Sequence, residues 1–238
     1  MSGQVNENHS ESPSTRFAGF DHLELYVGNA RQAAYFYQTG FGFTPVAYAG
    51  PETGVRDRTS FVVAQGEIRL VLTSALGPEG DIAAHFLRHD DGVRDIALSV
   101  TDARSAFAET VANGARPILP PTVLEDECGR LVKATVAVFG DTVHSFIERN
   151  GYAGVFAPGY QPIPTTAPPR DAGLNRIDHL AISVEPGEAD KWVDFYTRTF
   201  GLEHTQSEDI SSEYSGMKTD VVRAVSEHRD GQAGQAGQ

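Results

Sequence analysis

The stretch IDHLAISV, residues 177–184, repeats a pattern that the chain first shows as FDHLELYV, residues 20–27. The two stretches share Asp, His, Leu and Val at matching positions. In both, apolar residues alternate with other residues, which is typical of a β-strand with one face on a core. The sequence therefore predicts two strands that open two copies of one repeated module.

A helix is predicted after each of these strands, because apolar residues recur at i, i+3, i+4 and i+7 and so share one helical face. They are Ala30, Ala33, Ala34 and Tyr37 in the first copy, and Ala189, Trp192, Val193 and Tyr196 in the second. Each helix is expected to end at a glycine, Gly42 or Gly201, since glycine readily adopts the conformation that closes a helix. Trp192 and Tyr196 are predicted to belong to the core.

A third, weaker copy lies between the other two, with a predicted strand at residues 93–100 and a predicted helix at residues 103–111. When the copies are aligned on Val100 and Val184, Asp95 stands where the last copy has His179. Further strands flank glycine turns, at residues 61–64, 68–72, 134–139 and 143–147. Each module is thus predicted to read strand, helix, then several strands.

These patterns predict an α+β fold of repeated βαβββ modules, with one complete two-module domain and an incomplete third module. In the third module only one further strand is predicted, at residues 216–222. The expected divisions are a disordered leader at 1–16, the N-terminal domain at 17–150, a proline-rich linker at 151–176, the start of a second domain at 177–223, and a disordered low-complexity tail at 224–238.

Composition narrows the classes of function. The net charge of −13 repels phosphate backbones, and no basic patch is interleaved with aromatic residues, so nucleic-acid binding is not expected. No apolar run approaches the roughly 20 residues that span a bilayer, so no membrane partner is expected. The single cysteine, Cys128, cannot form an intramolecular disulfide, which fits a reducing compartment and predicts a cytoplasmic location.

The paired modules resemble the vicinal oxygen chelate superfamily, in which two modules form a half-open cup that often holds a divalent metal. Five segments resemble more closely the 4-hydroxyphenylpyruvate dioxygenase family. They are FDH at 20–22, DGVRDIA at 91–97, GDTVH at 140–144, GVFAPGY at 154–160 and IDH at 177–179. The resemblance covers about residues 17–222 and ends where the family would continue, so the chain resembles a C-terminally truncated member.

The resemblance implies a non-haem Fe(II) dioxygenase whose second domain holds the iron through two histidines and one carboxylate. His179 matches the first ligand, and the other two would lie outside this chain. Thr219 falls where the family places a polar side chain near the substrate. The resemblance further implies a 2-oxoacid substrate with O2, homogentisate and CO2 as products in tyrosine breakdown, a homo-oligomer, and impaired activity of these residues alone.

Two alternatives remain open. Hydroxymandelate synthase resembles the dioxygenase in fold, metal and substrate but hydroxylates the benzylic carbon. A non-catalytic binding or oligomerisation module is the other, because the first domain offers no convincing set of metal ligands.

Four other histidines are predicted to be structural or exposed. His22 stands at the place equivalent to His179, but the partner module offers Asp95 and no second histidine. His85 and His89 are spaced i, i+4, yet no HExxH glutamate stands between them, and a solvated polar turn is predicted there. His144 is predicted to be structural, and the acidic neighbours of Cys128 disfavour a thiolate.

Overall fold

The structure is a computed structural model that describes residues 17–164, 172–211 and 216–224. These residues fall into two compact units, a first unit of Phe17–Val184 and a second unit that begins at Glu185. The predicted leader at 1–16 and almost all of the predicted tail lie outside the described residues. None of the helices in the described ranges has the length and apolarity needed to span a bilayer.

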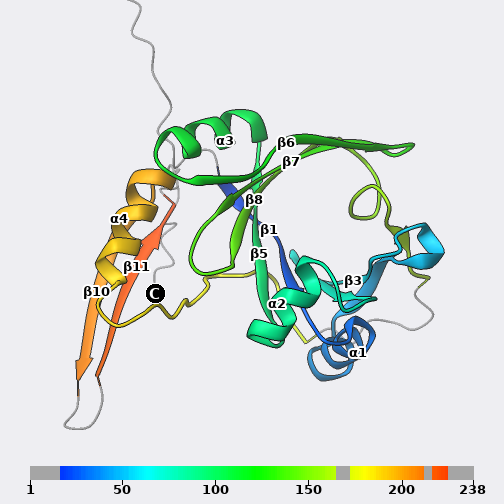
Figure 1. Ribbon diagram of the computed structural model, residues 1–238, viewed down its shortest axis with the longest axis horizontal. Helices are drawn as coiled ribbons and strands as arrows, with labels where there is room; N and C mark the ends of the chain where they lie inside the picture. Colours follow the sequence, from blue (N-terminus) through cyan, green and yellow to red (C-terminus); the bar gives the residue numbers. More distant parts are fainter. Residues whose placement is uncertain (1–16, 165–171, 212–215, 225–238) are drawn as a thin grey trace, which may run out of the picture. The chain divides into compact units, whose positions relative to one another are not determined.

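The first unit is built on a nine-stranded sheet with the order β6-β7-β8-β5-β1-β4-β3-β2-β9 (Figure 1). Its first module contains β1 (Phe17–Tyr26), α1 (Ala30–Phe41), β2 (Thr44–Ala49), β3 (Arg58–Gln65) and β4 (Ile68–Ala75), with a short 3₁₀ turn at Pro51–Thr53. Then come α2 (Asp81–His89), β5 (Gly92–Val100), α3 (Ala103–Ala112), β6 (Arg116–Asp126), β7 (Gly129–Ala137), β8 (Val143–Tyr152) and the short β9 (Gln161–Pro162).

The predicted repeat is confirmed, because β1, α1, β2, β3 and β4 are followed by an equivalent set, β5, α3, β6, β7 and β8. The first strand of each module lies parallel to the last strand of the same module, β1 to β4 and β5 to β8. The two modules join through the antiparallel pairing of β1 with β5. The α+β fold of βαβββ modules is therefore present as one continuous sheet.

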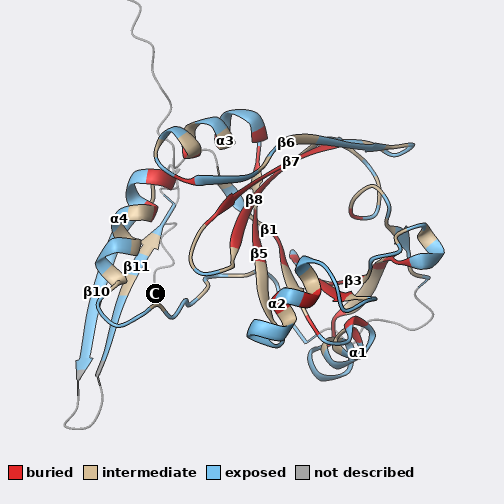
Figure 2. Ribbon diagram, in the orientation of Figure 1, coloured by how far each residue is buried: buried red, intermediate tan, exposed pale blue. Residues whose placement is uncertain are grey.

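The sheet is curled, and its concave face is called the cup below (Figure 1). Side chains alternate across it as expected for a pleated strand. On β4, Leu70 and Leu72 pack with the α1 residues Ala30 and Ala34, whereas Val71 belongs to a separate cluster on the cup side. Buried residues concentrate in the strands and on the sheet-facing sides of the helices (Figure 2).

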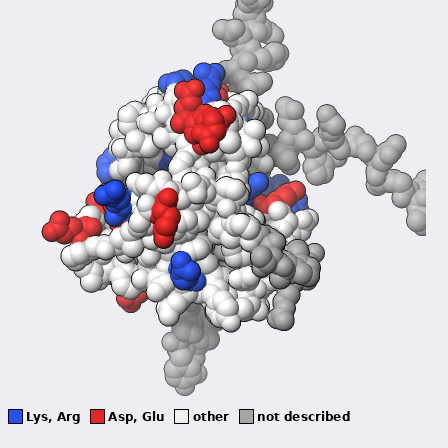
Figure 3. Space-filling view, turned by 90° about the vertical axis from the view of Figure 1, so that its right-hand side faces the viewer, with Lys and Arg blue, Asp and Glu red and all other residues white. Residues whose placement is uncertain are grey.

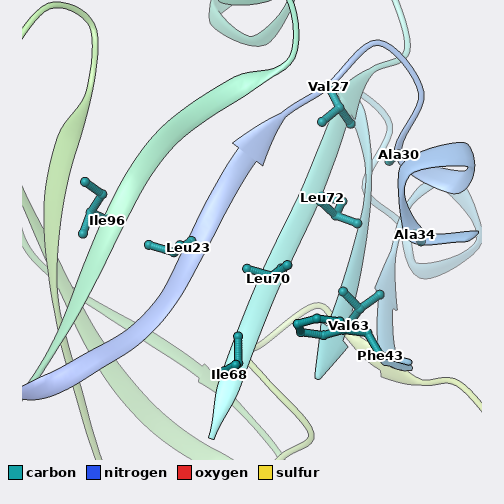
Figure 4. Packing of buried hydrophobic residues seen from close by; sticks show 10 residues of the cluster. All are labelled: Leu23, Val27, Ala30, Ala34, Phe43, Val63, Ile68, Leu70, Leu72 and Ile96. Carbon is teal, nitrogen blue, oxygen red and sulfur yellow. The ribbon is translucent and has the colours of Figure 1, made fainter. Parts of the chain in front are cut away.

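The main apolar core lies between α1 and the sheet, and Figure 4 shows its ten buried side chains. Small residues on α1 allow the helix backbone to approach the sheet closely. Asn29 caps the start of α1 by accepting a hydrogen bond from the Gln32 N–H at 3.0 Å. The helix ends at Gly42, whose φ of 76° is in the left-handed region, as the sequence predicted.

Replacement of Leu72 by alanine should destabilise the first unit by about 2–5 kcal/mol, because the side chain is 0% exposed and its loss leaves a cavity. The measurement is urea unfolding of the full chain. Leu87→Ala is the matched control, since Leu87 is 80% exposed and its truncation should change the unfolding free energy by less than about 0.5 kcal/mol. Equal effects of the two substitutions would contradict the assignment of the core.

The second unit contains α4 (Ala189–Phe200), β10 (Glu203–Ser211) and β11 (Gly216–Arg223). As predicted, α4 ends at Gly201, which has a φ of 67°. Tyr196 is buried as predicted, and Trp192 is half-buried and packs edge-on against Phe195. The two strands form a separate antiparallel hairpin.

The predicted strand at residues 177–184 is not formed, and this prediction was wrong. The equivalent β1 hydrogen-bonds to β4 on one side and β5 on the other, whereas no ladder partner for 177–184 exists among the described residues. An alternating pattern alone does not hold a strand, because its backbone groups need partners. Instead, Ile177 and Leu180 pack against the main apolar core.

The first unit extends beyond the predicted domain end at residue 150. Strand β9 pairs with β2, and Phe156 is buried among residues of β2, β3 and β4. Later in the predicted linker, the Asn175 carbonyl accepts from the Glu67 N–H, and Gln65 Oε1 accepts from the Leu174 N–H at 2.9 Å. The linker is therefore partly fixed to the sheet through backbone hydrogen bonds.

Helix α2 and the strands β2, β6, β9 and β10 were not predicted. Residues 81–89 form helix α2 rather than a polar turn. Residues 116–126 form β6 although they include three prolines, Pro117, Pro120 and Pro121. Proline is tolerated there because β6 is an edge strand with one side of its backbone unpaired.

The β10–β11 hairpin is expected to promote aggregation, because both of its strands are edges and Ile210, Met217 and Val221 are 57%, 57% and 41% exposed. Replacing Val221 with lysine should lower the rate of aggregation of the purified chain, followed by light scattering. The same change at Leu87, an exposed residue on a helix, is the control and should have a smaller effect. If Val221→Lys leaves the rate unchanged, the hairpin is not the origin of association.

Candidate metal site and the interior of the first unit

The predicted iron ligand, His179, lies in the irregular segment that follows the sheet. Its Nδ1 donates to Asp178 Oδ2 at 2.9 Å, and the two side chains are 81% and 80% exposed. This hydrogen bond lowers the pKa of the Asp178 carboxyl. A carboxylate bonded to one ring nitrogen fixes a histidine for metal binding through the other nitrogen, so Nε2 of His179 is the atom that could hold a metal.

Within the described residues, no group of three or more His, Cys, Asp or Glu side chains has a geometry that could hold a metal ion. His179 thus fits one position of a three-ligand iron site, and the described residues do not complete that site. Thr219, the predicted substrate contact, is exposed on β11 opposite Glu208 and belongs to the second unit, whereas His179 belongs to the first. The roles of His179 and Thr219 stay predictions.

The same Asp-His pair occurs in the first module in a different environment. A bulge in β1 at Asp21 breaks the regular register with β5 and allows adjacent side chains to meet. Nδ1 of His22 donates to Asp21 Oδ1 at 2.6 Å, and both residues are 5% exposed. Arg149 on β8 forms a bidentate pair with the same carboxylate, with N···O distances of 2.6 and 2.8 Å.

Burial alone would raise the pKa of the Asp21 carboxyl, because a charge is less stable away from water. The hydrogen bonds from Arg149 and His22 outweigh that effect and hold the pKa well below its usual range. The carboxylate is thus ionised at neutral pH and fully engaged by its two partners. The burial and pairing of His22 are those of a structural residue.

The cup contains a second charged network. Glu24 on β1 and Asp95 on β5 stand directly opposite each other in the sheet. Lys133 on β7 donates to Asp95 Oδ2 at 3.0 Å, and Ser145 donates to Asp95 through both its backbone N–H and its hydroxyl. Thr73 donates to Glu24 Oε1 at 2.7 Å. Two carboxylates that would repel each other therefore share the positive charge of Lys133.

Burial would lower the pKa of the Lys133 ammonium, but the Asp95 and Glu24 carboxylates raise it above the ordinary value. For Asp95, burial alone would raise the pKa, while Lys133 and the Ser145 hydrogen bonds bring it below the ordinary value. Burial, followed by the charge of Glu24, raises the pKa of Tyr26 and of Tyr160 to about 12. At neutral pH the network therefore contains Lys133 as a cation, Asp95 as an anion and two neutral phenols.

Three further histidines of the first unit divide between core and surface. His144 is buried and donates through Nδ1 to the Ile96 carbonyl at 2.8 Å. His85 was predicted to be exposed, and this was wrong, because it is 7% exposed and packs edge-on against Tyr26 on the inner side of α2. His89, one turn further along α2, has its ring centroid 4.6 Å from that of His85, is exposed, and contacts Asp141 Oδ2 at 2.8 Å. Cys128 is exposed in the turn between β6 and β7.

Sequence reasoning missed Lys133 and Arg149. A signal was present, because Lys133 is the one charged residue in the apolar run LVKATVA, and a charge on a buried strand requires a partner. Its partner Asp95 stands 38 positions earlier, on the first strand of the same module, so the pair becomes visible only after the strands are assembled. Figure 3 shows that one face of the molecule is mostly uncharged, with acidic and basic side chains both scattered over it.

Residues 19–142 match the model of the Glyoxalase/Bleomycin resistance protein/Dioxygenase superfamily. This match agrees with the curled sheet of βαβββ modules, and the chain belongs to that superfamily.

Within it, the chain is similar to 4-hydroxyphenylpyruvate dioxygenases. It is 39% identical to the one from Yarrowia lipolytica over 89% of this chain and 57% of the relative. For the one from Dictyostelium discoideum the identity is 37%, over 88% of this chain and 59% of the relative. The chain thus spans less than three fifths of these curated relatives.

A solved structure of a mutant 4-hydroxymandelate synthase from Streptomyces coelicolor superposes with a TM-score of 0.75 and 31% identity, over 87% of this chain and 60% of that one. A xylose isomerase-like TIM barrel/4-hydroxyphenylpyruvate dioxygenase fusion protein shares the fold, with a TM-score of 0.64 and 22% identity, over 87% of this chain and 30% of that one. The βαβββ fold predicted from the repeat is therefore confirmed by solved structures.

Lys133→Met should destabilise the chain by about 3 kcal/mol at pH 7, because it leaves Asp95 and Glu24 facing each other without a cation. The folded-state pKa of Asp95 is lowered in the natural chain, so its contribution is present above the ordinary pKa of about 4 and is lost as the pH falls further. In the variant, burial raises that pKa. The deficit should therefore shrink between pH 7 and pH 4, measured by urea unfolding.

Arg58→Met is the matched control, because Arg58 pairs with the exposed Asp57 at 3.1 Å. Exposed pairs contribute little, so this change should alter the unfolding free energy by less than about 1 kcal/mol at either pH. A Lys133→Met deficit that stays constant from pH 7 to pH 4 would show that packing of the lysine stem, and not its charge, is responsible.

Proposed function

We propose that this chain carries the first domain and the start of the catalytic domain of a 4-hydroxyphenylpyruvate dioxygenase. The reaction would convert 4-hydroxyphenylpyruvate and O2 to homogentisate and CO2 in tyrosine breakdown. The observation that carries the proposal is the 39% identity to the Yarrowia lipolytica dioxygenase over 89% of this chain. It is supported by the Asp178–His179 hydrogen bond, which leaves one imidazole nitrogen for a metal.

The proposed cofactor is Fe(II), held in this chain by His179 alone. When bound by a complete set of ligands, Fe(II) would supply neighbouring coordination positions for the 2-oxoacid and O2. The contribution of this chain would be to orient His179 through Asp178 and, in the proposed assignment, to place Thr219 near the substrate. A cytoplasmic location and self-association through the first domain belong to the same proposal.

A polypeptide of these 238 residues alone is expected to show no iron-dependent oxygen uptake with 4-hydroxyphenylpyruvate. The physical reason is that one imidazole makes a single bond to Fe(II) and leaves most of its hydration shell in place. The measurement uses an oxygen electrode, with chromatography of the products. Turnover by this polypeptide would contradict the expected absence of a complete metal site.

The function itself is tested on the longest polypeptide that the DNA encodes around these residues, read downstream in all frames. If it supplies a second histidine and a carboxylate, we expect Fe(II)-dependent turnover that His179→Ala abolishes. His89→Ala is the control, because it removes another histidine outside the candidate site and should leave turnover unchanged. An extended polypeptide that folds, binds Fe(II) and does not consume 4-hydroxyphenylpyruvate would overturn the proposal.

Hydroxymandelate synthase is a second candidate, favoured by the 31% identity and TM-score of 0.75 to the mutant Streptomyces coelicolor enzyme. The product distinguishes the two, since homogentisate carries a new ring hydroxyl and hydroxymandelate a benzylic one. A non-catalytic module would instead fold and self-associate without binding Fe(II) or the oxoacid.

A further inference from the structure

The segment after β8, residues 153–160, enters the cup of the first unit, and we call it the strap. Most of its residues are exposed or half-buried, and only Phe156 is buried, at 6% exposure. The ring of Phe156 packs with Ala47, Val62 and Val71, which come from three neighbouring strands and face the cup. The strap therefore contributes the buried ring of Phe156, with the half-buried Tyr160 beside it, to an interior that the strands form.

Three groups surround the Phe156 ring in the manner of an aromatic-binding site. The Arg149 guanidinium lies over its face at 5.1 Å from the ring centroid. The rings of His22 and Tyr160 meet it edge-on, with centroid separations of 5.1 and 4.9 Å. A cation over the face and ring edges at the sides are both attractive arrangements for an aromatic ring.

The two groups on the sheet, Arg149 and His22, are held in place by interactions that do not involve the ring. Asp21 holds Arg149 through two hydrogen bonds and His22 through one. The guanidinium also donates to the Phe156 carbonyl, which places the strap backbone at the same site. The site is thus preorganised by a buried ion pair that belongs to the sheet and not to the strap.

The strap itself makes few hydrogen bonds to the sheet. At its start the Ala153 N–H donates to the Cys128 carbonyl at 2.9 Å, and just beyond its end the Ile163 N–H donates to the Val46 carbonyl at 3.0 Å. Strand β9, which follows it, is two residues long. A segment with so few backbone bonds can open locally while the strands stay paired.

The geometry points to an aromatic-ring-binding site in the cup of the first unit, bounded on the sheet by His22, Arg149 and the apolar residues of β2, β3 and β4. The chain fills this site with its own Phe156, and Tyr160 of the same strap flanks the ring. The ligand class is a small aromatic compound without charge on the ring. Phe156 occupies the site that a free ligand would occupy, so a ligand can bind only when the strap moves away from the sheet. The residues of this site do not include His179 or Thr219, and the inference does not depend on the proposed function.

The test uses the full chain with Phe156→Ala and two matched probes, phenol and cyclohexanol. Phenol is expected to raise the midpoint of thermal unfolding of the variant by several degrees at millimolar concentration, and to bind about tenfold more tightly than cyclohexanol. The natural chain should show neither effect. Failure of phenol to bind the variant, or equal binding of both probes, would overturn the inference.

Two variants serve as controls. Phe43→Ala removes a phenylalanine of similar burial, 5% exposed, from the main apolar core, so it should show no preference for phenol over cyclohexanol. Phe156→Leu keeps the volume filled and should bind neither probe. A phenol preference in Phe43→Ala equal to that in Phe156→Ala would also refute the site.

If Phe156→Ala does not fold, hydrogen exchange of the natural chain tests whether the strap opens locally. The amides of Ala153 and Ile163 are then expected to exchange at least about tenfold faster than those of β1 and β5, through local opening of the strap. Exchange of both sets at the same rate would show that the strap leaves only when the sheet unfolds, and the inference would fail.

Discussion

The antiparallel pairing of β1 with β5 is the interaction on which the first unit depends. It joins two modules, each with its own helix and hairpin, into one curled sheet with a single cup. It also places Glu24 opposite Asp95, so the cup needs a cation, and Lys133 from β7 supplies it. The pairing of the two modules thereby determines which charged side chains meet inside the cup. The cup forms only when both modules are present, because each module supplies one of the two paired strands.

The two Asp-His pairs show that the surrounding residues determine whether the same motif is buried or exposed. Asp21–His22 and Asp178–His179 have the same sequence and the same local hydrogen bond, at 2.6 and 2.9 Å. The first pair is buried because β1 has partners on both sides and Arg149 neutralises the carboxylate. The second is exposed, since no strand partner for its segment exists among the described residues. The motif therefore marks the start of a module, and its chemistry depends on what assembles around it.

Much of the fold could be predicted from the sequence. The period of two in residues 20–27 and the helical spacing after it predicted β1 and α1, and Gly42 and Gly201 closed their helices as expected. The wrong predictions have one cause: a local sequence pattern carries no information about which distant residues will pack beside it. Residues 177–184 alternate like a strand without a partner, and His85 lies in a polar stretch yet turns its ring against Tyr26.

By itself the sequence determined the repeated modules and the glycines at which α1 and α4 end, because these depend on residues close together in the chain. The position of His179 as a candidate ligand came from the family resemblance. The tertiary structure alone decided that Lys133 meets Asp95, that Arg149 meets Asp21, and that Phe156 fills the cup. Arg149 and Asp21 stand 128 positions apart in the chain. Contacts over such separations arise only when the strands pair, so no local pattern could predict them.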